Sequence, residues 1–363
     1  MKHQKLGDIC SRLSSGKSIK TTEIQDSGSY PVLGGNGLRG YTKTYNFDGD
    51  CAVIGRQGAA CGNVRFHSGK AYMTEHAVVA VADENNDSRY LAYLLSTMHL
   101  GHLSAQSAQP GLSVKALSMQ EIDLPSLEVQ RQVVRVLGAL DDKIEANAKL
   151  NGYLAELADS HFKESFGSLE ANASLSDIAE VTMGQSPAGS SYNEAGDGTV
   201  FYQGRGEFGW RYPTQRLFTT EPKRMASEGD VLMSVRAPVG DLNIAFERCC
   251  IGRGLAGIHS EFLSYVLYLM RSLRPQLDAY NGEGTVFGSI NGKALKAMPI
   301  ALPGRSSIED FESFARPIDR TIRCNEQENR HLEQLRDTLL PKLMSGEIDV
   351  SEVDLTQPNS HLA

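Results

Sequence analysis

Two glycine-rich stretches come closest to a pattern that could perform chemistry. Gly35-Asn-Gly-Leu-Arg-Gly40 and Gly252-Arg-Gly-Leu-Ala-Gly257 both match G-x-G-x-x-G, the pattern that places a dinucleotide's pyrophosphate at a helix N-terminus. Such a site requires a preceding strand, a following helix and an acidic residue for the ribose. Strand- and turn-like sequence follows the first stretch, and no acidic residue stands at the required distance from the second. We therefore expect no cofactor at either stretch, and interpret the glycines as flexible backbone that approaches another molecule closely.

No other stretch has the residue types and spacing of a catalytic or metal site. His99-Leu-Gly-His102 has a spacing that can hold a metal ion, but no cysteine or carboxylate cluster accompanies it, so a histidine pair at a helix end is the preferred interpretation. The sequence contains no nucleophile elbow, zinc-protease motif or phosphate-binding P-loop. We expect a non-catalytic protein that uses neither a metal nor a cofactor.

Polar and basic residues beside glycines remain, and they occur at similar places in the two halves of the chain. Arg, Gln and Asn side chains can pair with guanine and adenine edges, and glycine lets backbone amides approach phosphates. Any one of these residues could equally be a solvated loop residue, but the set occurs twice. The predicted DNA-binding residues are Lys17, Asn36, Arg39, Lys43, Arg56, Gln57, Ser113 and Lys115 in the first half, and Gln185, Gln203, Arg205, Arg236, Arg253, Asn291 and Lys293 in the second.

The distribution of charge is compatible with DNA binding. The 363 residues carry a formal net charge of −8, which would oppose binding to phosphates if it were spread evenly. Residues 1–120 hold 12 basic and 9 acidic side chains, and residues 173–303 hold 12 and 13. The acidic excess lies in residues 121–172 and 304–363. Because the local distribution decides where DNA can lie, the net charge does not exclude a DNA-binding protein.

The cysteines and the apolar residues indicate a cytoplasmic protein. The six cysteines include no C-x-x-C pair and no spacing typical of a disulfide framework, which fits a reduced compartment. No apolar run approaches the roughly 20 residues that cross a bilayer, and the basic N-terminus is not followed by the apolar segment of a signal peptide. We expect no association with membranes.

An internal repeat organises the chain. Ile122-Asp-Leu-Pro125 recurs as Ile300-Ala-Leu-Pro303, and the same offset of 178 residues relates Ile144 to Ile322. Tyr90-x-x-Tyr-Leu94 likewise matches Tyr265-x-x-Tyr-Leu269. The offset varies upstream and is constant downstream, which indicates loop insertions before one rigid element in each half.

The rigid element of each half is predicted to be a long helix. Apolar residues recur there at alternating spacings of three and four, which is typical of a coiled-coil seam, and asparagines at matched positions fit layers that set the register. Pro317 has no counterpart in the first half and is expected to kink or split the second helix. The predicted seam consists of Leu137, Leu140, Ile144, Asn147, Asn151, Leu154, Ile318, Ile322, Asn325, Asn329, Leu332 and Leu339.

These elements predict an α+β protein in which two mixed α/β domains are separated by two long antiparallel helices, with a pseudo-twofold internal repeat. A single amphipathic helix packed on a globular core is the less favoured interpretation, because two equal seams in one chain can bury each other. The predicted boundaries are 1–125 and 167–303 for the two domains, 126–166 and 304–350 for the central and distal helices, and 351–363 for a flexible tail.

Nearly the full length of the chain resembles the specificity subunits of type I restriction–modification enzymes. The resemblance is carried by the order and duplication of several stretches rather than by one decisive motif. Two lie in the first half and two in the second, and each helix also resembles the family's spacer helix. The stretches are Tyr30–Tyr41, Gly49–Gly58, Gly229–Gly240 and Cys250–Gly257, with Leu339–Gly346 as the usual ending.

The resemblance implies a DNA-binding specificity subunit. Each domain would be a target-recognition domain that reads one half of a split double-stranded target, and the helices would fix the gap between the halves. Two modification subunits, which bind S-adenosylmethionine and methylate adenine, would dock on the chain, and restriction subunits would join them. Helices of about 37 residues span roughly 55 Å, ample to hold two readers one DNA turn apart. Two alternatives remain: an enzyme that binds a nucleotide cofactor at a glycine-rich loop, and a coiled-coil interaction protein without a DNA role.

Overall fold

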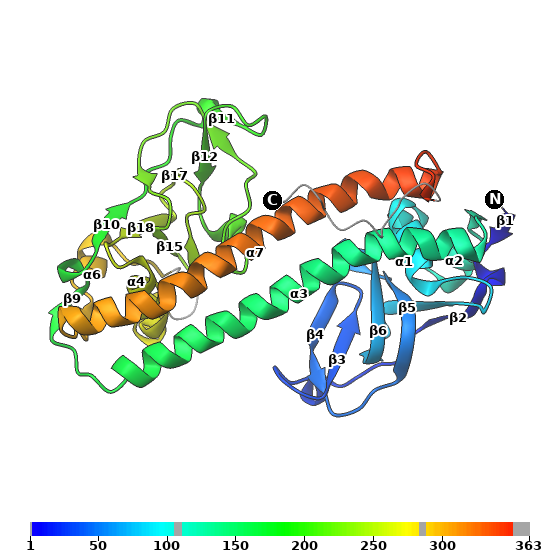
Figure 1. The fold of residues 1–363 in the computed structure, drawn as a ribbon, viewed down its shortest axis with the longest axis horizontal. Helices are drawn as coiled ribbons and strands as arrows, with labels where there is room; N and C mark the ends of the chain where they lie inside the picture. Colours follow the sequence, from blue (N-terminus) through cyan, green and yellow to red (C-terminus); the bar gives the residue numbers. More distant parts are fainter. Residues whose placement is uncertain (1, 105–110, 283–287, 351–363) are drawn as a thin grey trace, which may run out of the picture. The chain divides into compact units, whose positions relative to one another are not determined.

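The computed structural model describes residues 2–104, 111–282 and 288–350, and the chain forms two compact units (Figure 1). Unit 1 combines residues 1–146 with 328–363, and unit 2 consists of residues 147–327. Both boundaries fall inside long helices, α3 (Leu127–Phe166) and α7 (Arg305–Ser345). Each unit therefore contains a part of both helices. The predicted tail, 351–363, lies outside the described residues.

Unit 1 is built on a six-stranded sheet with the order β2-β7-β5-β6-β3-β4. Neighbouring strands are antiparallel except for β3 and β6, which are parallel. A separate antiparallel pair joins β1 (Lys2–Lys5) to β8 (Glu121–Leu124). The strands of the main sheet are β2 (Cys10–Ser15), β3 (Tyr30–Gly34), β4 (Gly37–Thr42), β5 (Phe47–Gly55), β6 (Val64–Met73) and β7 (Ala77–Ala82).

Helices cover one face of this sheet. The helix α1 (Ser88–Thr97) begins at Asp87, whose carboxylate accepts hydrogen bonds from two backbone amides of the first turn. Its buried Tyr90 and Leu91 pack with Val78 and Ala80 of β7 and with Leu137 of α3. A second cluster on the other face includes Val53 and Val79. The shorter helices are α2 (Val114–Ser118) and the 3-10 turns Leu6–Asp8, Thr21–Glu23, Gly58–Ala60 and Leu100–Leu103.

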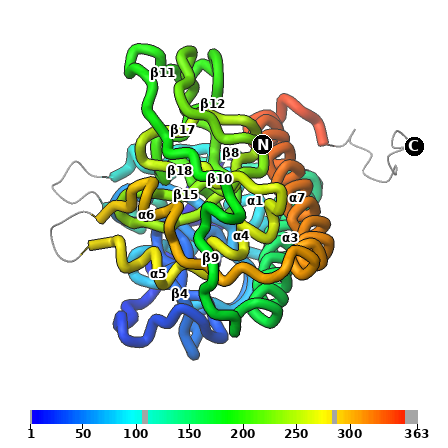
Figure 2. The backbone as a smooth tube through the Cα atoms, turned by 90° about the vertical axis from the view of Figure 1, so that its left-hand side faces the viewer, coloured from blue at the N-terminus to red at the C-terminus, as the bar shows by residue number. Residues whose placement is uncertain are grey.

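Unit 2 contains two larger sheets and a two-stranded pair (Figure 2). The four-stranded antiparallel sheet has the order β10-β18-β15-β16, and the five-stranded sheet has the order β11-β13-β12-β17-β14, with β12 and β17 parallel. The strands are β9 (Ala173–Ser174), β10 (Glu180–Met183), β11 (Tyr192–Asn193), β12 (Thr199–Tyr202), β13 (Phe218–Thr219), β14 (Met225–Ala226), β15 (Val231–Ser234), β16 (Leu242–Ile244), β17 (Cys249–Ile251), β18 (Leu255–His259) and β19 (Pro299–Ile300), which pairs with β9.

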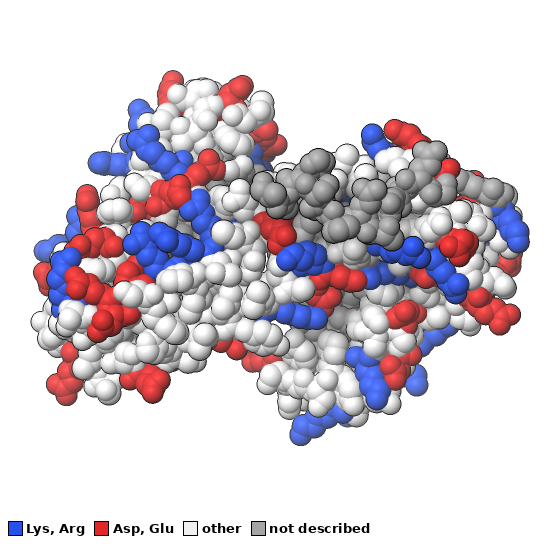
Figure 3. All heavy atoms as spheres, viewed as in Figure 1, with Lys and Arg blue, Asp and Glu red and all other residues white. Residues whose placement is uncertain are grey.

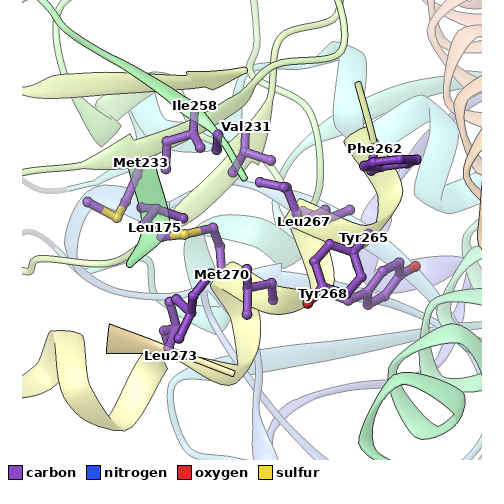
Figure 4. Packing of buried hydrophobic residues seen from close by; sticks show 14 of the residues in the cluster. Leu175, Val231, Met233, Ile258, Phe262, Tyr265, Leu267, Tyr268, Met270 and Leu273 are labelled. Carbon is purple, nitrogen blue, oxygen red and sulfur yellow. The ribbon is translucent and has the colours of Figure 1, made fainter. Parts of the chain in front are cut away.

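The core of unit 2 forms between α4 (Leu263–Ser272) and the four-stranded sheet. Leu267 and Met270 of the helix and Val231 and Ile258 of the strands belong to one buried cluster, part of which Figure 4 shows from close by. Aromatic residues of the long helices complete this core; Phe162 of α3 and Phe311 of α7 meet edge to face at 5.3 Å. The remaining helices are α5 (Arg274–Asp278), α6 (Gly292–Lys296) and the 3-10 turns Leu175–Asp177, Gly189–Ser191, Arg205–Glu207 and Ala279–Asn281.

The two long helices contact each other antiparallel within each unit. In unit 2, Asn325 donates to the Asn151 amide oxygen at 2.8 Å, and Asn151 donates to Glu326 at 2.9 Å. In unit 1, the Lys143 ammonium lies 3.2 Å from the Glu328 carboxylate. All twelve residues of the predicted seam are buried or half-buried.

The helix α7 continues through Pro317 without a break, so the expectation that this proline splits the helix was wrong. Pro317 removes one backbone donor in the fourth turn of the helix, but the neighbouring turns keep the helical conformation, and Thr321 donates to the Pro317 carbonyl at 3.0 Å. The helix ends at Ser345, because Gly346 adopts a φ of 77°, the left-handed conformation that stops helices. None of the described helices is long and apolar enough to span a membrane.

Candidate nucleic-acid interface

Several predicted residues of unit 1 gather where strands of the main sheet end. We call this region the unit 1 edge; it comprises residues 16–18, 35–36, 56–57, 74–76 and 111–113. Lys17 follows β2 and its amide donates to the Met73 carbonyl at the end of β6, while the Arg56 amide donates to His76 just before β7. The Leu112 amide donates to the Arg56 carbonyl. Backbone hydrogen bonds therefore bring together loops that are far apart in the sequence.

The side chains at the unit 1 edge differ in their exposure to solvent and in their hydrogen bonds. Lys17, Asn36 and Gln57 are exposed. Arg56 is half-buried and donates to the Leu112 carbonyl at 3.3 Å and to the Ser15 hydroxyl at 3.4 Å, which makes it a support for these loops. Arg39 lies exposed on β4. Lys43 follows the opposite end of β4 and is not part of the edge.

Unit 2 has a comparable edge, lined by four of the predicted residues. Gln203 follows β12, Arg236 follows β15 and Arg253 follows β17, and together with Arg205 they line a shallow depression of about 350 Å³. We call these four residues and Gln185 the unit 2 edge. Gln185 belongs to it because its amide donates to the Ile251 carbonyl, two residues before Arg253.

Two of the predicted DNA-binding residues serve as helix caps. Ser113 accepts a hydrogen bond from the Ala116 amide at the start of α2, and Asn291 accepts one from Ala294 at the start of α6. Since these oxygens satisfy backbone donors, they position the helices that carry Lys115 and Lys293. Both lysines are exposed, and both stand two residues beyond their cap.

The arginines of the unit 2 edge differ in whether they form an ion pair with a described residue. Arg205 pairs with Asp241, which also accepts from Arg274 at 2.8 Å. Burial alone would raise the pKa of Asp241, but the hydrogen bonds from Arg274 and Arg205 outweigh burial and lower it. Arg236 and Arg253 are exposed and form no ion pair with any described residue. Their guanidinium groups are thus the ones available to an external anion or base edge.

Sequence reasoning missed two residues, His76 and Glu207, that lie at the edges. His76 lies at the unit 1 edge, where its Nδ1 is 3.0 Å from the Gln57 amide oxygen. Glu207 lines the depression in unit 2 and accepts from Arg216 at 2.8 Å. His76 has no glycine neighbour, and Glu207 is acidic, so a search for basic and amide side chains beside glycines did not select either residue.

Neither glycine-rich stretch has the setting that a dinucleotide site requires. The first glycine-rich stretch forms the turn and strand of the β3–β4 hairpin, and the second runs from β17 into β18. Neither opens a helix, so neither provides the helix N-terminus that a pyrophosphate needs. Among the described residues, no group of three or more His, Cys, Asp or Glu side chains could hold a metal ion. Figure 3 shows basic and acidic side chains interleaved on the visible face.

Comparison with known proteins gives one consistent result. A family model described as the type I restriction modification DNA specificity domain matches residues 1–154. The putative type I restriction enzyme MjaX specificity subunit of Methanocaldococcus jannaschii is 30% identical over 322 residues, which cover 80% of this chain and 76% of that protein. The type I restriction enzyme EcoprrI specificity subunit of Escherichia coli is 38% identical over 144 residues, 39% of this chain and 36% of that protein.

The fold is also similar to a solved structure. The type I restriction–modification S subunit from M. genitalium superposes with a TM-score of 0.65 at 16% identity, and the match covers 94% of this chain and 95% of that one. At this identity the likeness concerns the fold.

Proposed function

The chain belongs to the family of type I restriction–modification specificity subunits, and on this premise we propose that two target-recognition domains, 1–125 and 167–303, each read one half of a DNA target. The observation that carries the proposal is the presence in each unit of an edge where exposed polar and basic side chains follow strand ends. Direct reading of bases requires such donors and acceptors on rigidly supported loops. The family role is recognition of a DNA sequence.

We further propose that residues 126–166 and 304–350 are spacers that pair as an antiparallel coiled coil in a pseudo-twofold molecule. The buried or half-buried positions of the twelve seam residues and the hydrogen bond between Asn325 and Asn151 support this pairing. The equivalent capping roles of Ser113 and Asn291, which are 178 residues apart, support the internal symmetry.

Catalysis is assigned to partner subunits in this proposal. Two modification subunits would bind S-adenosylmethionine and methylate adenine, restriction subunits would add cleavage, and the complex would work in the cytoplasm. An apolar strip on α3 supports docking of a protein partner: Leu150, Tyr153 and Leu157 are 45%, 69% and 52% exposed, and their spacing places them on one helix face. The cofactor-enzyme alternative lacks a helix after either glycine-rich stretch, and an interaction protein without a DNA role would not need the two edges.

Exchange of one recognition domain tests the proposal. Replacing residues 1–125 with the corresponding domain of a relative is expected to change one half of the methylated sequence and to leave the other half and the gap unchanged. Single-molecule sequencing of DNA from cells that also contain the modification subunit measures the result. The reciprocal exchange of residues 167–303 should change only the other half. The chain without a modification subunit should transfer no methyl groups. A change of both halves in either exchange contradicts two separate readers.

Substitutions at the unit 2 edge should separate base reading from general attraction. Arg236→Ala or Arg253→Ala is expected to weaken binding to the target by about 1–3 kcal/mol if the side chain pairs with a base. Competition binding on targets altered at single positions would then show relaxed selectivity at one position. Arg248→Ala is the matched control, because Arg248 is exposed and directly precedes β17, whereas Arg253 follows that strand. Equal binding by all three variants and the parent would remove these arginines from the interface.

A further inference from the structure

The repeated Tyr-x-x-Tyr-Leu sequence has a specific place in each unit. It lies on α1 in unit 1 and on α4 in unit 2, the helices that pack against the sheets. In both units the second tyrosine donates its hydroxyl proton to an aspartate of a long helix: Tyr93 to Asp141 of α3, and Tyr268 to Asp319 of α7. The two aspartates are 178 residues apart, the offset that relates the helices. The same contact therefore joins each domain to its own long helix.

In unit 1, arginines extend this contact to both long helices. Arg336 of α7 donates to the other oxygen of Asp141 at 3.0 Å. Arg89, one turn before Tyr93, donates to the Gly138 carbonyl at 3.2 Å and to Asp142 at 2.8 Å. A Cβ on Gly138 would come within 3.1 Å of the Arg89 guanidinium, so glycine at this position permits the approach. We call Tyr93, Asp141, Arg89 and Arg336 the unit 1 clasp.

In unit 2, a buried arginine completes the equivalent contact. Arg211, with 5% of its surface exposed, donates to the Tyr268 hydroxyl at 3.1 Å and pairs with Asp319. Tyr268 is fully buried, and its hydroxyl lies 3.0 Å from Asp319. Burial raises the pKa of both clasp tyrosines, so they remain protonated donors at neutral pH. We call Tyr268, Asp319 and Arg211 the unit 2 clasp.

A second buried polar contact joins each domain helix to a long helix at its N-terminus. Gln130 of α3 accepts from the Asp87 amide at 2.9 Å, and Glu312 of α7 accepts from the Tyr265 amide at 3.0 Å. Both side chains are buried. Each domain helix is thus held at two points, which fixes its direction as well as its position.

Polar contacts of this kind determine geometry more than they add stability. Apolar packing is non-directional, so the cores alone would tolerate small rotations of a domain on its helix. Hydrogen bonds weaken steeply away from their preferred angle, and buried ion pairs gain little over apolar residues of similar size. A clasp retained in both units therefore points to a requirement for one orientation.

We propose that the two clasps are positioning residues that set the angle at which each domain presents its edge relative to its long helix, and thereby restrict the gap between the two halves of the DNA target. This inference rests on the proposed function. The residues of the clasps touch the helices and do not belong to either edge. Weakening them should loosen the selection of the gap while the bases read in each half stay the same.

The test uses the full chain with its modification subunits and the double variant Y93F/Y268F. Binding is measured on duplexes whose two half-targets are separated by the parental gap, or by one base pair more or fewer. The preference of the parent for its own gap is expected to fall about tenfold in the double variant, the equivalent of one lost hydrogen bond to a charged group. Affinity for a duplex with only one half-target should not change.

The control is the double variant Y90F/Y265F. Tyr265 is on the same helix as Tyr268 and is equally buried, but its hydroxyl donates to the Ala301 carbonyl, which precedes α7. The control should keep the parental gap preference. The clasp role is overturned if Y93F/Y268F retains the parental preference, or if Y90F/Y265F loses as much. A parent protein that selects no bipartite target would overturn the proposed function as well.

Discussion

Replacement of Arg211 by methionine is expected to lower the free energy of unfolding of unit 2 by about 3–5 kcal/mol. The side chain of Arg211 is 5% exposed and that of Asp319 is 15% exposed. Burial would lower the pKa of Arg211, but Asp319 and Tyr268 outweigh burial and raise it, so the arginine is charged in the folded protein. The substitution would leave the Asp319 carboxylate largely shielded from water and without its cationic partner. An unpaired buried charge lowers the free energy of unfolding more than the replacement of both charged residues by apolar ones does.

Urea unfolding of the full chain, followed by circular dichroism and by tryptophan fluorescence, measures this loss. Trp210 is the single tryptophan of the sequence and precedes Arg211, so its emission reports on unit 2. The control is Arg211→Met combined with Asp319→Leu, which removes both charges. It should be more stable than Arg211→Met alone, because no unpaired charge remains. A loss below about 1 kcal/mol for Arg211→Met would show an interaction no stronger than an exposed salt bridge.

Insertion of four residues into both long helices, after Lys149 and after Gln327, is expected to lengthen the gap in the DNA target. Four residues add about 6 Å of helical rise, and one or two base pairs at 3.4 Å each span a similar length. The insertion advances each helix by about 40° beyond a full turn, so the seam should stay in contact with modest strain. Methylated-site mapping should find the same two half-targets with a gap longer by one or two base pairs.

A two-residue insertion at the same positions is the control for the prediction that helix length sets the gap. Two residues rotate the part of each helix that follows the insertion by about 200° relative to the part that precedes it, so the seam no longer continues along one face of either helix. Loss of methylation at every gap length is expected. An active four-residue variant with the parental gap would show that other elements set the spacing.

The long helices could be predicted because their signal is local and periodic. The three-and-four spacing identified α3 almost to the residue, and the start of α7 at Arg305 lies one residue from the predicted start. The continuity of α7 through Pro317 could not be predicted in the same way. A proline in a helix costs a known amount, but whether the surrounding packing compensates depends on contacts with residues distant in the sequence, such as that of Tyr268 with Asp319.

The residue types of the candidate interface could be predicted from the sequence, but the ion pairs of these residues could not. Polar and basic loops, some of them flanked by glycine, marked Arg236, Arg253 and Gln203, which the fold brings to one edge. The sequence could not show that Asp241 pairs with Arg205, since the two residues are 36 positions apart and meet through the sheet. The clasps were visible only as a repeated Tyr-x-x-Tyr-Leu pattern, because their aspartate partners lie about 50 residues further along.

The division of both long helices between the units has a consequence for synthesis on the ribosome. Residues 147–327 contain all of unit 2, so this unit can close while the last part of the chain is still being translated. Unit 1 cannot, because Leu343 and Met344 pack into the same core as Leu6 and Leu137. Residues 1–146 must therefore wait for residues 343–344, with part of their apolar surface uncovered in the meantime. Slowed translation or a premature stop between residues 327 and 343 should consequently expose unit 1, rather than unit 2, to chaperones and proteases.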